Sequence, residues 1–390
     1  MKRPASAARG LSEQAAAEVV STSDVGSSPA AGSSPASGSS PEVGVRAVID
    51  RVTAGRRSRR RRYLLVCVSL MVLVLAMLAV SLMFGRQFYG PGEVVRVLLG
   101  EQVPGASFTV GVLRLPRALV GLLAGIAFGM AGITFQTMLR NPLASPDIIG
   151  ISSGASAAAV FSIVMLSLSE TAVSIVATIA ALATAGVIYL LSFRGGLSGT
   201  RLILIGIGIA AMLQSVVSYV ISRAAQWDLQ TAMRWLNGNL NGATMDQVVP
   251  LVVAVAIGAV VLTMLSKGLD TLRLGEETSA ALGVSVERTR LLLILFAVAL
   301  LAFGTAAAGP VAFVAFLYGP ISVRLLGRAG SAGSPLIPAA LVGALLILVA
   351  DFAGQFAFGT RYPVGVITGV LGAPYLIYLL VRSTRSGGAQ

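Results

Sequence analysis

Residues able to carry out chemistry are scarce in this sequence. Its 390 residues include no His, one Cys (Cys67) and two Lys (Lys2 and Lys267). Without His a Ser–His–Asp triad is excluded, and a metal site built from His or Cys is not expected. Neither Lys stands in a G-x-x-x-x-G-K-[ST] phosphate-binding loop. We therefore expect no catalytic residue, no metal site and no cofactor bound by this chain.

Asp351 is the one acidic residue well inside an apolar stretch. Ion-coupled carriers usually place several ionisable groups near the middle of the membrane, so a single carboxyl group is weak support for ion coupling. We favour a role for Asp351 in hydrogen bonding or helix packing over a role in ion transport.

Apolar segments must position these residues. The chain is 55% apolar and 12% charged, with a mean hydropathy of +0.85, whereas a soluble protein needs more charge to cover its surface. Charge-poor apolar stretches, most of them near the roughly 20 residues that cross a bilayer, lie at 63–84, 112–136, 148–168, 170–193, 201–222, 247–266, 291–308, 310–324, 336–357 and 364–381. We predict an all-α polytopic membrane protein with about ten transmembrane helices.

The seventh and eighth stretches could form either one long helix or two spans. Residues 291–323 carry no charge, and as one helix they would be roughly 50 Å long, too long for one crossing without a large tilt. Gly309 and Pro310 provide a break, so two spans are predicted. Ten spans place both termini on one side of the membrane. The alternative is nine spans, with the carboxyl terminus outside.

The two ends of the chain differ from its middle. Residues 1–44 are rich in Ser, Ala, Pro and Gly, which predicts disorder, and 45–62 end in a run of six arginines, Arg56, Arg57 and Arg59 to Arg62. Such a run can bind nucleic acid, but an apolar segment begins directly after it, so we interpret it as a topology signal. We predict a disordered tail with a basic arm (1–62), a transmembrane domain (63–383) and a short carboxyl-terminal tail (384–390).

Basic residues also predict the orientation. With the amino terminus in the cytoplasm, that side carries 22 Lys and Arg and the outside carries 7, in the sense of the positive-inside rule. We therefore place the protein in the cytoplasmic membrane with both termini in the cytoplasm. Of the net charge of +13, 11 basic and 5 acidic residues belong to 1–62. The charge marks topology and docking, and no nucleic-acid partner is expected.

Four glycines of the second span, Gly121, Gly125, Gly129 and Gly132, recur at intervals of four and three residues. They share one helix face, and small residues let helix backbones approach closely in a membrane. We favour helix packing over a pore-lining role for this face.

The loop 267–290 differs from the other loops because it mixes charges with apolar residues. A helix over 275–282 would carry Glu276 and Glu277 in its first turn, where the helix dipole favours them, and Gly283 could end it in a left-handed cap. A second helix could begin over 284–290. Two short amphipathic helices suit docking to a soluble partner, and a solvated connector is the equally open alternative.

Six motifs occur in the order found in a known family. They are 113–117 (LRLPR), 140–147 (RNPLASPD) with 150–155 (GISSGA), 235–242 (WLNGNLNG), the loop segment 274–284, 309–314 (GPVAFV), and 363–365 (PVG) with 372–375 (GAPY). In these motifs the sequence resembles the permeases of the iron-chelate and cobalamin uptake family, which are membrane subunits of type II ATP-binding-cassette importers. The resemblance covers about residues 63–383.

The resemblance implies a cobalamin-importer-permease-like fold and roles for individual residues. It implies ATPase coupling through Leu274, Gly275, Glu276, Glu277, Leu282 and Gly283. It implies docking of a binding protein by Arg114 and Arg117, and from a shifted position by Arg361, although the first two could instead reach lipid headgroups. It implies a structural signature of Arg140, Asn141, Pro142, Pro146, Gly150, Gly154, Gly309, Pro310 and Asp351.

The function implied is ATP-driven import of an iron–siderophore complex, with cobalamin or heme as alternatives. ATP would be bound and hydrolysed by a separate cytoplasmic ATPase, so the chain itself would not be an enzyme. The other partners implied are an extracytoplasmic substrate-binding protein, a second permease chain of the same or a similar kind, and membrane lipid. Two rivals of other classes are an ion-coupled secondary transporter and a passive membrane scaffold or receptor.

Overall fold

The computed structural model describes residues 41–387, except Leu143, Pro146, Ile148, 194–198, 328–329 and 331–332. Every element within these residues is a helix: α1 (Pro41–Met83), α2 (Pro91–Leu98), the π-helix η1 (Ser107–Arg114), α3 (Leu115–Met138), α4 (Ile151–Val164), α5 (Glu170–Ser192), α6 (Gly199–Ser222), α7 (Gln226–Leu236), α8 (Met245–Met264), α9 (Ser266–Leu272), α10 (Glu276–Ala281), α11 (Val286–Ala308), α12 (Val314–Leu326), α13 (Leu336–Phe356) and α14 (Val364–Gly387). The all-α prediction is confirmed. The chain divides into two units, Met1–Thr53 and Ala54–Gln390, and the packing described below is that of the second unit.

Seven helical segments are long and apolar enough to cross a membrane: Val52–Met83, Ser107–Met138, Glu170–Ser192, Gly199–Ser222, Met245–Met264, Val286–Ala308 and Leu336–Phe356. Three shorter apolar helices, Ile151–Val164, Val314–Leu326 and Val364–Tyr378, coincide with the three remaining predicted spans. The break at Gly309 and Pro310 is confirmed, since α11 ends at Ala308 and α12 begins at Val314. The chain is a multi-pass membrane protein, and the count of ten spans stays a prediction.

The predicted boundaries of the two tails differ from the observed helices. Residues 41–62, which belong to the predicted tail and basic arm, are helical and continue into the first span as part of α1. At the other end α14 continues to Gly387, beyond the predicted domain limit at 383. Residues 1–40 and 388–390 lie outside the described residues.

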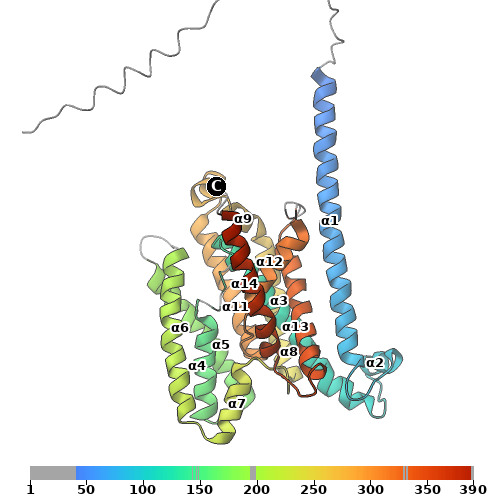
Figure 1. Ribbon diagram of the computed structural model, residues 1–390, viewed down its shortest axis with the longest axis vertical. Coiled ribbons are helices and arrows are strands. Elements are labelled where there is room, and N and C mark those ends of the chain that lie inside the picture. Colours follow the sequence, from blue (N-terminus) through green and yellow to red (C-terminus); the bar gives the residue numbers. More distant parts are fainter. Residues whose placement is uncertain are drawn as a thin grey trace, which may run out of the picture. The chain divides into compact units, whose positions relative to one another are not determined.

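Helix α3 is the central element of the bundle and packs against α13, α11, α12 and α8 (Figure 1). Its glycine face makes this packing possible. A Cβ atom added to Gly125 would lie 2.5 Å from the carbonyl oxygen of Gly343 in α13, and one added to Gly132 would lie 2.9 Å from the carbonyl oxygen of Ala315 in α12. The backbone of α3 is therefore in direct contact with the backbones of α13 and α12, as small residues allow in a membrane. The helix-packing interpretation of the glycine face is confirmed.

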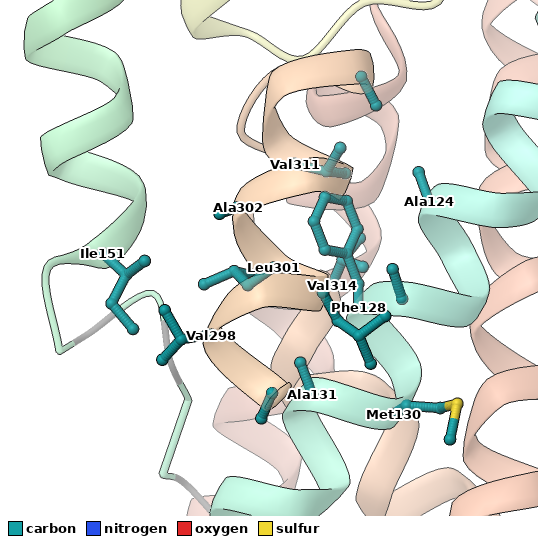
Figure 2. Close-up of a cluster of buried hydrophobic side chains, with 14 of the residues drawn as sticks. Ala124, Phe128, Met130, Ala131, Ile151, Val298, Leu301, Ala302, Val311 and Val314 are labelled. Carbon is teal, nitrogen blue, oxygen red and sulfur yellow. The ribbon is translucent and has the colours of Figure 1, made fainter. Parts of the chain in front are cut away.

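On another side of α3, large side chains fill the space towards α11. Phe128 of α3 belongs to the same buried hydrophobic cluster as Leu301 and Ala302 of α11 (Figure 2). The glycine at 304 makes room for the ring, because a Cβ atom there would lie 2.8 Å from Cε1 of Phe128. Helix α3 therefore lies between α13, which it contacts through glycines, and α11, which it contacts through the ring of Phe128.

Helices α4 to α7 form a second group beside this centre (Figure 1). Gly150 caps the start of α4 with a φ of 90°, a left-handed conformation that glycine adopts without strain. A Cβ atom on Gly150 would lie 3.0 Å from the carbonyl oxygen of Gly206 in α6, and one on Gly154 would overlap the side chain of Thr184 in α5. These two signature glycines therefore allow α4 to pack closely between its neighbours.

The membrane part of α1 contacts the bundle along one face. Tyr63, Leu70 and Val74 are buried on that face, where Val74 packs with Ala344 and Leu348 of α13. The hydroxyl of Tyr63 donates a 2.8 Å hydrogen bond to the carbonyl oxygen of Ser334. These contacts fix the rotation of α1 about its own axis.

Candidate functional site

The predicted coupling region, residues 267–290, contains the short helices α9 and α10. Helix α10, Glu276–Ala281, falls within the helix predicted over 275–282. The predicted second helix does begin within 284–290, at Val286, but the prediction that it is short is wrong, because these residues are the first turns of α11. No helix-breaking residue separates Val286 from the apolar run that follows, so the helix continues as a span. Movement of the coupling region would therefore reach a membrane helix directly.

Helix α10 ends in a Schellman cap at Gly283, which has a φ of 83°. The amide of Gly283 donates to the carbonyl of Ala280 at 2.9 Å, and the amide of Val284 donates to the carbonyl of Ser279 at 3.0 Å, as this cap requires. The predicted left-handed cap is confirmed. At the start of α10, Gly275 has a φ of 120°, so glycines bound the short helix at both ends.

Two large apolar side chains flank α10 and face outward. Leu274 is 62% exposed and Leu282 is 61% exposed, and both lie in a loop outside the predicted spans. Glu277 in the first turn of α10 is exposed as well. Exposed leucines rimmed by charge are typical of a protein-binding surface, so this part of the loop can receive a partner.

Side chains from the bundle hold α9 and α10 in place. Arg290 of α11, whose side chain is 12% exposed, forms an ion pair with Glu276 of α10. Arg140, after the end of α3, donates from Nε to the carbonyl oxygen of Leu272 at 3.1 Å. The hydroxyl of Ser279 donates to the carbonyl oxygen of Thr271 at 2.8 Å. The coupling region is thus attached to α3 and α11, the two helices at the centre of the core.

Arg140 has a φ of 50°, a conformation that costs a residue with a side chain about 1 to 2 kcal/mol. It stands where a glycine usually ends a helix, since the amide of Asn141 donates to the carbonyl of Gln136 at 3.1 Å and Pro142 follows. The contact of the Arg140 side chain with α9 is a reason for a non-glycine residue in this strained position. Pro146 of the same signature lies outside the described residues.

A second site lies at the opposite ends of these helices. The guanidinium of Arg117 in α3 forms a two-bond ion pair with Asp351 in α13, with Nη2–Oδ1 at 2.7 Å and Nε–Oδ2 at 2.9 Å. The two side chains are only 13% and 8% exposed. Gln355 donates to Oδ2 of Asp351 at 2.9 Å, and Arg117 also donates to the side-chain oxygen of Asn241. Asp351 therefore has the hydrogen-bonding role favoured above, and its partner is an arginine on another helix.

Arg114 also points inward. It is the last residue of η1, and its guanidinium donates to the carbonyl oxygens of Leu82, Met83 and Gln87 at 2.8, 2.9 and 2.7 Å. It therefore binds the carbonyl groups of Leu82 and Met83 in the last turn of α1, which have no partner within the helix, and that of Gln87 beyond it. The guanidinium of Arg114 thus has three partners within the chain, without a docked protein or a lipid headgroup. Arg114 and Arg117 do not lie on one regular α-helix, because the π-helix η1 ends at Arg114 and α3 begins at Leu115.

Arg361 completes this second site from the loop between α13 and α14, where it is exposed. A cavity of about 450 Å³ is lined by Arg86, Arg114, Arg117 and Arg361 together with Asp351. The tertiary structure thus brings the three predicted docking arginines together with a fourth. Four guanidinium groups facing one carboxylate leave an excess of positive charge, which favours binding of an acidic group.

Three of the predicted motifs, 235–242, 309–314 and 363–365, contact one another. The amide of Asn239 donates to the carbonyl of Ala308 at 2.8 Å, and the amide of Gly365 donates to the carbonyl of Gly238 at 3.2 Å. Gly309 has a φ of 73°, and a Cβ atom there would lie 2.6 Å from the carbonyl oxygen of Trp235. The glycines of these motifs therefore join three loops, and Pro310 follows where α11 has ended.

Several residues of the two sites could not be predicted from the sequence. Arg290 and Glu276 are 14 positions apart and belong to different helices, so no helical spacing indicates their pairing. Asn241, Gln355 and Arg86 are ordinary polar residues in the sequence. Among the described residues, no three Asp, Glu or Cys side chains gather as a metal site would require.

Comparison with known proteins decides the family. Residues 72–382 match the model of the FecCD transport family. The chain belongs to the FecCD transport family. Similar proteins are the ferric enterobactin transport system permease protein FepG of Escherichia coli (strain K12), 37% identical over 83% of this chain and 98% of FepG, and the achromobactin transport system permease protein CbrC of Dickeya dadantii (strain 3937), 36% identical over 80% of this chain and 90% of CbrC.

A solved structure agrees with this assignment. An inward-facing conformation of a metal-chelate type ABC transporter superposes with a TM-score of 0.72 at 25% sequence identity, covering 81% of this chain and 98% of that chain. The resemblance drawn from the six motifs is confirmed. Every site residue described above lies within the part of this FecCD-family chain that matches the family model, whereas the arginine run at 56–62 lies before it.

Proposed function

We propose that the chain is the permease subunit of an ATP-driven importer that carries an iron–siderophore complex across the cytoplasmic membrane. The observation that carries this proposal is the coupling region, whose exposed leucines lie beside a short helix clamped to α3 and α11. FepG and CbrC support the substrate class, since their names specify ferric enterobactin and achromobactin transport. The cobalamin import permease BtuC of Halobacterium salinarum, 34% identical over 70% of this chain, supports cobalamin as the second candidate.

The proposal assigns ATP binding and hydrolysis to a separate cytoplasmic ATPase, and this chain is a transport subunit without catalytic residues. The ATPase contacts Leu274, Leu282 and Glu277, while Gly275 and Gly283 shape the helix between them. Glu276 has a different task, because its ion pair with Arg290 connects that helix to α11. Force from the ATPase then passes through two contacts, Glu276–Arg290 and Arg140–Leu272, into the core.

The arginine cavity is proposed as the docking site of an extracytoplasmic substrate-binding protein. Acidic side chains of that protein would meet Arg361 and Arg86 first, since Arg114 and Arg117 are already engaged inside the chain. Charge complementarity of this kind raises association rates and selects the partner. A second permease chain, the same or similar, completes the pathway. The topology proposed here keeps both termini in the cytoplasm.

Ion-coupled transport is the rival function, and the ion pair argues against it. Asp351 is bound by Arg117 and Gln355, so its charge is already compensated by the protein. A carboxylate that carries protons or sodium needs to exchange its partner during the cycle. The Arg117–Asp351 geometry instead suits a permanent connection between α3 and α13.

Reconstitution tests the proposal. The purified chain is placed in liposomes with a nucleotide-binding subunit and a binding protein encoded beside it, and uptake of a ferric siderophore is measured. We expect uptake only with ATP and both partners. Uptake driven by a proton or sodium gradient with this chain alone would contradict the proposal. Growth of a deletion strain on single iron sources, with cobalamin and heme utilisation measured in parallel, identifies the substrate.

A further inference from the structure

The arginine run at the start of the first span is divided between the faces of α1. Arg57, Arg60 and Arg61 are followed by Leu64, Leu65 and Val68, at spacings of three and four residues that place all six on one stripe of a helix. All six side chains are exposed, the apolar three by 52%, 59% and 58%. A shallow groove of about 360 Å³ lies between them. We call these six residues the arginine–leucine stripe.

The rotation of α1 directs the stripe away from the bundle. Tyr63, Leu70 and Val74 are buried against the bundle, and the Tyr63 hydrogen bond to Ser334 holds this rotation. Arg62 lies on the bundle side of the stripe, with Nη2 3.4 Å from the place where a Cβ atom of Gly327 would be. The stripe therefore faces the surroundings of the protein, while part of the same run faces its own loops.

The chemistry of the stripe changes along the helix. Both halves lie in the helical segment Val52–Met83, which is apolar enough to cross a membrane. The leucine half belongs to its charge-free part, which begins at Tyr63, and its expected neighbours in a membrane are acyl chains. The arginine half directly precedes that charge-free part, at the level where headgroup phosphates are expected. None of the ion pairs recorded among the described residues involves Arg57, Arg60 or Arg61. Guanidinium groups bind phosphate oxygens in two-bond geometry and carry a full charge.

We propose that the arginine–leucine stripe is a binding site for one anionic phospholipid of the leaflet at the amino-terminal end of α1. Arg57, Arg60 and Arg61 bind the phosphate of the headgroup, and Leu64, Leu65 and Val68 pack against its acyl chains. A soluble polyanion could reach the arginines but has no group to cover the apolar half. The site lies outside residues 72–382 that match the family model, so it does not depend on the proposed transport function.

The chain offers a matched control for this proposal. Arg57 and Arg60 belong to the stripe, whereas Arg56 and Arg59 have the same spacing and charge on other faces of the helix. The variants R57Q/R60Q and R56Q/R59Q therefore lose the same charge next to the same span. Binding of dioleoylphosphatidylglycerol and dioleoylphosphatidylcholine to the full-length chain in detergent is measured by native mass spectrometry, and thermal unfolding shows whether each variant is folded.

We expect the wild type to bind phosphatidylglycerol in preference to phosphatidylcholine. R57Q/R60Q removes two of the three guanidinium groups that bind the phosphate in the proposed site, so it should bind phosphatidylglycerol about tenfold or more weakly. R56Q/R59Q leaves all three in place and should stay within about twofold of the wild type. Should R57Q/R60Q fail to fold, the variant R61Q, with R62Q as its control, replaces it and should show the same contrast. Equal losses in both variants would indicate diffuse attraction and would overturn the site. Displacement of the lipid by millimolar inorganic phosphate or glycerol 3-phosphate would show that free phosphate is the ligand and would overturn it too.

Discussion

Arg117 on α3 and Asp351 on α13 are 234 positions apart in the sequence and form a two-bond ion pair with N–O distances of 2.7 and 2.9 Å. The same two helices are in backbone contact through Gly125 and Gly343. A close helix contact and a buried ion pair near one end of it reinforce one another, because the glycines set the distance at which the two side chains meet. The pair therefore connects the core packing to the arginine cavity.

The first prediction concerns this ion pair. R117Q leaves the carboxylate of Asp351 buried without its counter-charge and should cost about 3 to 5 kcal/mol of stability. The double variant R117Q/D351N removes both charges and should recover most of that loss. Thermal unfolding in detergent measures both. R361Q serves as the control, since Arg361 is exposed and has no ion pair among the described residues. Equal stability of R117Q and R361Q would contradict the structural role of the pair.

A second prediction concerns the glycine face. G125A places a methyl group 2.5 Å from the carbonyl oxygen of Gly343, so α3 and α13 must separate, at a cost of about 1 to 3 kcal/mol. G208A in α6 is the matched control, because a Cβ atom there meets nothing within 4 Å. The yield of folded protein and the unfolding temperature should fall for G125A alone. Retention of both by G125A would mean that the helix contact is looser than described.

The third prediction separates docking from force transmission in the coupling region. L274S/L282S removes the exposed apolar surface and should reduce recovery of the ATPase in co-purification by about tenfold. R290M breaks the ion pair with Glu276 while leaving that surface intact, so the ATPase should still bind but ATP hydrolysis should drive less uptake.

The control for the coupling region is E287Q, which changes an exposed carboxylate in the first turn of α11 outside the ion pair and outside the proposed ATPase contact. Its ratio of uptake to ATP hydrolysed should stay at the wild-type value. Loss of ATPase binding in R290M to the same extent as in L274S/L282S would show that the ion pair supports docking and not transmission.

A fourth prediction addresses the arginine cavity. R86E/R361E reverses two charges that face the cavity without breaking the Arg117–Asp351 pair, so affinity for the binding protein should fall by at least about tenfold at low salt. The difference between variant and wild type should shrink at 0.5 M salt, because screening weakens attraction between exposed charges. Surface plasmon resonance with the chain in nanodiscs measures both. An unchanged affinity at low salt would remove the cavity from the docking surface.

The fifth prediction is a pH effect at Asp270 of α9. Burial raises the pKa of this carboxyl group, and Arg273 opposes the rise. The folded state therefore holds the proton more tightly than the unfolded chain, and stability is lost as pH rises from the ordinary value of 3.8 through the raised value. D270N removes this cost, so it should raise the unfolding temperature at pH 7 more than at pH 4. The reverse order would show that the contact with Arg273 outweighs burial.

Local patterns in the sequence predicted much of this fold. Apolar stretches predicted the helices, Gly309 and Pro310 predicted the break after α11, and Gly283 predicted the cap of α10. These features depend on residues that are adjacent in the sequence, so they can be predicted without knowing the tertiary structure. The start of the second coupling helix was predicted correctly, but its length was wrong, because the residues at 284–290 do not show that the helix continues into the next span.

The candidate sites, too, were predicted from the sequence only in their local features. The ordered motifs were sufficient to identify the family, because each motif meets a local backbone requirement such as a turn or a close helix contact. The pairing of Arg117 with Asp351, the internal contacts of Arg114, and the clamp of Arg290 on Glu276 depend on which helices become neighbours. That choice is made by shape, since glycine faces and large rings fit together only in the folded bundle. The sequence by itself determined a helical membrane transport protein of a recognisable family, and the tertiary structure alone decided which of its charges line the arginine cavity and which hold the helices together.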